Sequence, residues 1–348
     1  MKLYKKIIFI LIVFFKTGTV LSENNLFNVN NILLEKKDKN TNNVLANIAI
    51  KKGFDQLIEK ILLKEDRNKL TDLNLPSIKQ LVTYYQISKI EDEKKNQEFV
   101  NFSVTFDKQK IHNLFYKKGI LYSEIPDKEI YILPIFIKDN EIFIFNNNFF
   151  YRNWNNFYNV DLIEFILPLE NIEIIQNINK NKNNLINLKI DDLFKEYSSK
   201  NLALILIEDG KKNNEKIYLK TRIEGKNISK SINLKKENLK FDDFYKKIIT
   251  ESKKEIINLV KSENLIDIRT PSILNIKLNL NKQSNLVELH SRIKNIDLIE
   301  NVYVQEFTKN YMSLRIKYLG KLDKIINKLK DKNINLQLIN NQWIIQKL

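Results

Sequence analysis

The chain has 348 residues, six glycines, no cysteine and a formal net charge of +16. The missing cysteine excludes disulfides, thiolate metal sites, a cysteine nucleophile and lipid attachment through cysteine. With 43% hydrophobic residues the chain can bury substantial cores, so we expect a folded protein of two or three domains.

The positive charge is carried almost entirely by lysine. Only six of the 58 basic residues are arginine, the side chain that makes bidentate contacts to bases and phosphates. Lysine, asparagine and isoleucine are abundant along the whole chain. The charge therefore predicts solvated lysine faces and no nucleic-acid partner, while a weak attraction to anionic membrane headgroups or acidic envelope partners stays open.

The first 22 residues have the pattern of a secretory signal peptide. Three lysines precede the apolar run Ile7–Phe15, and compact residues lead to a predicted cut between Ser22 and Glu23. An uncleaved anchor is the alternative, but a membrane-spanning helix needs about 20 apolar residues. This run is already interrupted at Lys16. We therefore predict an exported protein.

An N-terminal α+β domain is predicted over residues 23–145. Val100, Phe102, Val104 and Phe106 alternate as the inner face of a strand, and Asp107 and Gly119 frame the helix that follows. The other expected elements are a strand at 26–34, a helix after Thr41, a helix from Pro76 through Val82, and an apolar hairpin formed by 130–137 and 141–145.

A central α+β domain is predicted over residues 146–265. Trp154 lies in an asparagine-rich aromatic stretch that forms either an interaction surface or, as we favour, a loop with Trp154 as its plug into the core. The expected elements are a strand at 163–169, a polar loop at 174–187, a short helix from Asp191, strands at 202–207, 216–223 and 227–234, and an amphipathic helix after Asp242 and Asp243.

A C-terminal module is predicted over residues 270–348. Strand and helix patterns follow each other in the order βαββαβ, which is the order of a ferredoxin-like module, and a final hairpin strand carries Trp343. The predicted fold class is therefore α+β, with several small modules of mixed sheet and helix. Such a module hosts many functions and does not decide between enzyme and binding protein.

Residues with chemical potential do not gather into a catalytic motif. The chain has no phosphate-binding glycine motif, no nucleophile elbow and no zinc-protease motif. His112 and His290 fall on different predicted helices, and His290 is expected to be partly buried. The acidic runs Glu91–Glu93, Asp191–Asp192 and Asp242–Asp243 are explained as a turn and two helix starts. We predict no catalytic, cofactor-binding or metal-binding residue.

Several segments follow one another in a recognisable order. After the signal come the helix ANIAIKKGFDQLIEKIL, a Leu-Pro step before LVTYY, the segment FSVTFDKQKIHNLFYKKG, then NLALILIEDG and the C-terminal module. In this order they resemble the proteobacterial exported proteins of domain of unknown function 2066, over nearly the whole chain after the signal. The chain lacks the tryptophan expected near Leu121 and Tyr122. The resemblance implies a bacterial envelope location and no catalytic residues to carry over.

The leading hypothesis is a soluble periplasmic protein that acts by binding, with another envelope protein as its expected partner. It needs no cofactor, and its oligomeric state stays open. One alternative is a carboxylate-dependent hydrolase acting on an envelope polymer, with acids supplied by different modules. A second is a protein anchored in the inner membrane by its uncleaved leader and facing the periplasm.

The protein isolated from its host is expected to begin at Glu23, because the signal pattern ends there. Intact-mass spectrometry measures this directly. A mass that includes the residues from Met1 would refute cleavage and favour the anchored alternative.

Overall fold

The computed structural model describes residues 26–36, 41–92, 97–125, 129–158, 162–209, 214–236, 239–280 and 285–346. The predicted leader and its cut between Ser22 and Glu23 lie outside these residues. Helices and small mixed sheets make up the chain, which confirms the α+β class. Unit 1 takes the described residues within Met1–Glu59, Lys69–Ile120 and Asp267–Leu348, and unit 2 takes Lys60–Asn68 and Leu121–Ile266.

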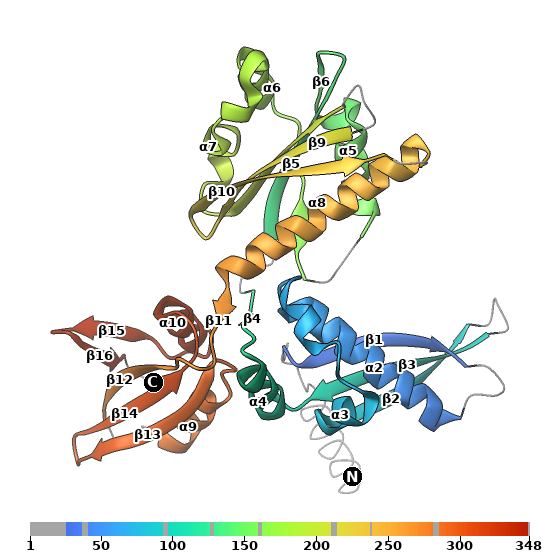
Figure 1. The fold of residues 1–348 in the computed structure, drawn as a ribbon. Helices are drawn as coiled ribbons and strands as arrows, with labels where there is room; N and C mark the ends of the chain where they lie inside the picture. Colours follow the sequence, from blue (N-terminus) through green and yellow to red (C-terminus); the bar gives the residue numbers. More distant parts are fainter. Residues whose placement is uncertain are drawn as a thin grey trace, which may run out of the picture. The chain divides into compact units, whose positions relative to one another are not determined.

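A three-stranded antiparallel sheet forms the first half of unit 1. Its strands are β1 (Asn28–Glu35), β2 (Val82–Asp92) and β3 (Gln97–Phe106), in the order β1-β3-β2. The helix α2 (Asn42–Ile61) covers one face, where the alternating residues of β3 from Val100 to Phe106 are buried as predicted (Figure 1).

Short capped helices flank this sheet. In α3 (Leu75–Gln80) the side chain of Asn74 accepts a hydrogen bond from Ser77 N, and Pro76 stands in the first turn. In α4 (Lys108–Lys118) Asp107 caps the start, and Gly119 ends the helix at φ 61°, as predicted. The helix expected to run through Val82 stops at Gln80, because the β-branched and aromatic residues that follow pair with β3 as β2.

The C-terminal half of unit 1 departs from a plain ferredoxin-like arrangement. Its elements are β12 (Ser272–Asn279), α9 (Leu286–Lys294), β13 (Ile299–Phe307), β14 (Tyr311–Tyr318), α10 (Leu322–Asp331), β15 (Leu336–Ile339) and β16 (Gln342–Ile345). The sheet order is β13-β14-β12-β16-β15. The hairpin strand β16, and not the fourth strand β15, therefore lies beside β12, and the two run parallel.

The turn between the last two strands explains this arrangement. Asn340 and Asn341 have φ angles of 48° and 60°, the pair of positive angles that a tight type I′ hairpin turn requires. The chain reverses there and pairs Ile345, which is buried, with Leu278 of β12. The fourth predicted strand is thereby displaced to the edge of the sheet.

Unit 2 is built on a six-stranded mixed sheet. Its strands are β5 (Glu129–Lys138), β6 (Glu141–Phe143), β7 (Glu164–Ile166), β8 (Asn201–Glu208), β9 (Asn214–Ile223) and β10 (Lys226–Lys235). They are ordered β10-β9-β8-β5-β6, with β7 also beside β5. β5 runs parallel to both β7 and β8, and the other pairs are antiparallel. β4 (Tyr122–Ser123) and β11 (Leu265–Ile266) form a separate small pair.

Helices cover both faces of this sheet. The long helix α8 (Phe241–Glu263) covers one face together with α5 (Phe149–Asn153) and the 3-10 helix η3 (Trp154–Asn156) (Figure 1). The other face packs against α6 (Ile172–Lys180), the 3-10 helix η4 (Lys182–Asn187) and α7 (Ile190–Leu193). β8 is therefore buried on both sides, which explains its continuous apolar sequence.

Two predictions fail in this unit. Residues 174–187 were expected to be a loop but form α6 and η4, because Asn171 caps α6 through Glu173 N and Ile174 and Ile178 bury one helical stripe. The domain boundary expected after residue 145 also differs, since β5 and β6 belong to the same sheet as β8.

At Gly53 the helix α2 lies close to the sheet. A Cβ there would lie 3.0 Å from Ile32 Cδ1 and 3.5 Å from Val104 Cβ. Gly53→Leu is therefore expected to lower the free energy of unfolding by about 2 kcal/mol through overpacking. Urea unfolding measures the change, with the exposed neighbour Lys52→Leu as the matched control. Equal effects of the two substitutions would contradict the close approach.

Candidate functional site

The carboxyl ends of β5 and β8 lie side by side, which is the edge where open α/β sheets usually bind ligands. Ile137 pairs with Glu208 at this end, and Glu208 pairs in turn with Lys216 of β9. The two faces of the sheet differ here: the α6 face carries a pocket, and the α8 face carries a group of ionisable side chains.

The pocket on the α6 face has a volume of about 550 Å³, within the range of about 300–1,000 Å³ that is typical of small-molecule sites. Its floor is apolar and its rim is polar. Strands β5, β6, β8 and β9, the β5–β6 turn and η4 all contribute. The lining residues are Ile137, Asn140, Ile142, Lys182, Asn183, Asn184, Leu185, Ile186, Leu206, Glu208 and Tyr218.

On the α8 face, Glu215 is a buried carboxyl group beside a second acid. Its side chain is 4% exposed, and its Oε2 atom has no hydrogen-bond partner in the described part of the chain. Burial, helped by the nearby charge of Asp209, raises the pKa of Glu215 to about 7, against a smaller lowering by Lys236 and Lys138. Asp209 itself pairs with Lys138 at 3.9 Å.

Tyr245 of α8 belongs to the same group. Its ring contacts Phe136, Phe149 and Phe150, with centroid distances of 5.0 to 5.7 Å. Burial, followed by the charges of Glu215 and of two aspartates, raises the pKa of Tyr245 to about 12. The group thus holds a carboxyl and a phenol that resist ionisation, at the rim of an aromatic cluster.

A hydrolytic pair of carboxyl groups does not follow from this arrangement. A glycosidase-type mechanism needs two carboxyl groups flanking one bond. Asp55 is a second carboxyl group whose pKa burial raises, but it lies on α2 in unit 1, whereas Glu215 belongs to unit 2. Among the described residues, neither unit by itself therefore holds a pair of carboxyl groups with raised pKa values that would support the hydrolase alternative.

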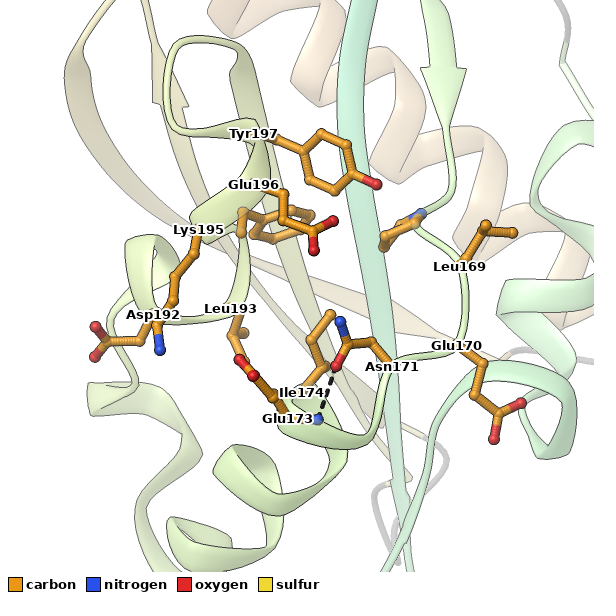
Figure 2. Close-up of a pocket in the computed structure, with 12 residues that line it drawn as sticks. Leu169, Glu170, Asn171, Glu173, Ile174, Asp192, Leu193, Lys195, Glu196 and Tyr197 are labelled. Atoms are coloured by element: carbon orange, nitrogen blue, oxygen red, sulfur yellow. Dashed lines mark hydrogen bonds between the residues drawn. The ribbon is translucent and has the colours of Figure 1, made fainter.

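A smaller pocket of about 250 Å³ lies between the start of α6 and the turn after α7 (Figure 2). Its volume falls below the usual range for ligand sites. Asn171 accepts a hydrogen bond from Glu173 N at its edge, at 2.7 Å. Figure 2 shows that Asp192 and Lys195 point to one side and Glu170 to the other, so the carboxylates do not converge. Among the described residues, no group of three or more His, Asp and Glu side chains could hold a metal ion.

The two histidines lie on α4 and α9. His112 is half-buried, its ring centroid is 5.6 Å from that of Phe27, and burial together with Lys108 lowers its pKa to about 4. His290 was expected to be partly buried but is exposed, because it follows the buried Leu289 by one residue and so projects from another side of the helix.

Trp154 is fully buried at 0% exposure, so the hypothesis that it belongs to an interaction surface is wrong. It packs edge-on against Phe165 at 6.2 Å and acts as the core plug that we favoured. Sequence reasoning missed a neighbour on α8: Lys253 is also buried, donates to Phe157 O at 2.8 Å and has a pKa that burial lowers to about 8. Its apolar neighbours Ile249, Ile256 and Ile257 were the available signal.

An exposed apolar edge is found instead on β2 of unit 1. Tyr84, Tyr85 and Ile87 are 50%, 41% and 44% exposed. β2 is an outer strand of its sheet and pairs with β3 without interruption from Tyr84 to Asp92. The β-branched and aromatic residues from Val82 to Ile87 were the available signal, but the sequence analysis expected a helix up to Val82 and no strand after it.

Comparisons with known proteins add little to this geometry. No protein-family model matches the chain, and no curated protein matches it. One solved structure, titled "Crystal structure of uncharacterized protein", is similar over 40% of this chain and 95% of its own, with 10% identity and a TM-score of 0.18. A score this low carries no argument, and the resemblance to the family of domain of unknown function 2066 stays a prediction. In the described residues, no helix is long and apolar enough to cross a membrane.

Glu215→Gln is expected to stabilise the protein at high pH. The raised pKa means that the unfolded chain loses this proton near pH 4.5 and the folded protein only near pH 7, so native stability falls over that interval. Above pH 7 the variant should be more stable by up to about 3 kcal/mol, and below pH 4.5 the difference should vanish. Urea unfolding at several pH values measures this. The exposed Glu208→Gln serves as control, and a pH-independent difference would contradict the assignment.

Proposed function

We propose that the protein is an exported binding factor of the bacterial cell envelope, and that it acts by contact with another envelope protein and not by catalysis. The exposed edge of β2 carries the proposal. An outer strand presents unpaired backbone N–H and C=O groups, which an extended segment of a partner can use as a template.

The side chains of β2 suit a protein partner. Tyrosine is enriched where proteins bind one another, because its ring buries a large area and its hydroxyl keeps a polar contact. Tyr85 and Ile87 lie opposite the buried residues Val104 and Phe102 on the α2 side of the sheet. An added strand would therefore place apolar side chains on this side.

On the other face of β2, polar side chains of the partner would fit best. Gln86 and Ser88 pair with Ser103 and Asn101 there. The partner proposed is therefore an extended segment that alternates apolar and polar residues.

Another outer strand offers a weaker template. β13 also exposes apolar residues, among them Val304 and Phe307, but its pairing with β14 shifts register between Ile299 and Asn301 and again between Val304 and Glu306. Such bulges bend an edge and disfavour the addition of a strand. β2 has one such shift, between Val82 and Tyr84 at its start, and pairs regularly with β3 from Tyr84 to Asp92. This longer regular stretch supports β2 as the binding edge.

A photocrosslinking residue placed at Tyr84 should give an adduct of one defined mass in the envelope of the native host. The same residue at Tyr116, which is 61% exposed on α4 of the same unit, is the matched control and should give none. Tyr85→Lys with Ile87→Lys should abolish the adduct, because two charges on the edge repel an apolar strand.

Two outcomes would sink this proposal. One is the same adducts from both positions, and the other is an adduct that survives the double lysine variant. Light scattering of the purified protein distinguishes a different partner protein from a second copy of this chain. An adduct of twice the chain mass, together with a dimer in solution, would identify the partner as a second copy.

A further inference from the structure

We infer that the 550 Å³ pocket at the carboxyl end of β5 and β8 binds a neutral, polyhydroxylated ligand, namely a short saccharide. This site goes beyond the strand-binding edge, because it belongs to unit 2 and the edge belongs to unit 1. The inference stands on the apolar floor, the free amides and the charge balance of the pocket.

The floor can take the C–H face of a sugar ring. Ile137, Ile142 and Leu206 contribute from three neighbouring strands, and Leu185 closes the pocket from η4. Branched aliphatic side chains of this kind offer an apolar surface without polar atoms. Contact with them removes apolar area of a bound ring from water.

The rim offers amide groups that hold no other partner in the described part of the chain. Asn140, Asn183 and Asn184 line the pocket, and no side-chain hydrogen bond engages them. Several other asparagines of unit 2 differ from them in this respect. The amides of Asn148, Asn155 and Asn264, for example, each donate to a backbone carbonyl within 3.1 Å. The rim asparagines can therefore bind a ligand without first breaking a side-chain hydrogen bond in the described part of the chain.

Local backbone geometry places these amides. Asp139 and Asn140 have φ angles of 50° and 64°, which close the tight turn between β5 and β6. Asn184 breaks the helical path of η4 with φ −151° and ψ 54°, so that it and its neighbour Asn183 both line the pocket. A side-chain amide can donate and accept hydrogen bonds at the same time, as a hydroxyl can. Two adjacent hydroxyls of a sugar can therefore pair with its N–H and C=O groups.

The charges at the rim favour a neutral ligand. Glu208 and Lys182 carry opposite charges, and Glu208 can accept from hydroxyl groups. Lys216 is placed opposite Glu208 in the sheet and lies 5.4 Å from the centre of the Tyr218 ring, but it does not line the pocket, whose own two charged side chains balance. No cluster of arginines is present to hold a phosphate or a carboxylate in the bidentate manner.

Methyl NMR of the full mature protein tests the inference, with maltose and N,N′-diacetylchitobiose as neutral probes. Both are added up to about 10 mM, which is ten times a dissociation constant of about 1 mM. The methyl signals of Ile137, Ile142 and Leu206 should shift with at least one of the two. A sulfated disaccharide derived from heparin should bind at least fivefold more weakly.

A matched pair of variants locates the binding. Asn183→Ala with Asn184→Ala should weaken it about tenfold, because two hydrogen bonds are lost. Asn227→Ala with Asn233→Ala removes two exposed amides from β10 of the same unit and should leave affinity unchanged. Circular dichroism confirms that both variants fold, and if the first does not, Asn140→Ser replaces it.

The inference is overturned if neither neutral sugar shifts the floor methyl groups. It is also overturned if the sulfated sugar binds as tightly as the neutral ones, or if the pocket and control variants lose affinity equally. These outcomes do not bear on the proposal for the β2 edge, and loss of the Tyr84 adduct does not bear on the proposal for the pocket. Each proposal can therefore fail without the other.

Discussion

The parallel pairing of β5 with β8 is the constraint on which unit 2 depends. Eight consecutive residue pairs, from Ile130 with Asn201 to Ile137 with Glu208, join the two strands in the middle of the sheet. Since parallel neighbours need a crossover, the chain between them has to leave the sheet and return. On that path it lays α5 and η3 on one face and α6, η4 and α7 on the other. This crossover thus contributes to both cores, and α8, which follows β10 in the chain, completes the first of them.

The same pairing explains why polar groups meet at one end of the sheet. Parallel strands bring their carboxyl ends to the same edge, so Lys138 and Asp209 come together directly after the last pair. The antiparallel β9 enters at this edge and adds Glu215 one residue before Lys216, which makes the last pair with β8. Its side chain is buried on the α8 face of the sheet, where its charge acts on Tyr245. The pocket opens on the opposite face because η4 does not cover the ends of the strands completely.

Local patterns were sufficient for single elements but not for their assembly. Strict alternation located β3 and β14, and the residues Asp107 and Gly119 located both ends of α4. Pairing over long separations has no local signal, which is why β5 was assigned to the N-terminal domain although its partner β8 begins at Asn201.

Composition misled the interpretation of α6 and of Lys253. Asparagine-rich segments suggest loops, yet here asparagines cap helices α3, α5, α6 and α9 with their side chains. Lysine was read as solvated, although Lys253 places its aliphatic stem in the core and its ammonium group on a backbone carbonyl. No residue of the candidate pocket was proposed in advance, because its lining comes from four strands, a turn and a 3-10 helix that meet only in the fold.

The abundance of asparagine and lysine bears directly on how surfaces of this protein should be judged. If both residues are common everywhere, their presence at a site means little, and their bonding state means more. An asparagine that caps a helix is explained by folding, whereas Asn183 and Asn184 border a cavity without a bond to explain them. The same reasoning applies to β2, where the unusual feature is not polar but aromatic. Two adjacent tyrosines remain exposed on an outer strand whose pairing with β3 is regular from Tyr84 to Asp92. In a chain with a biased composition, function is therefore best sought where a side chain has no structural task left to perform.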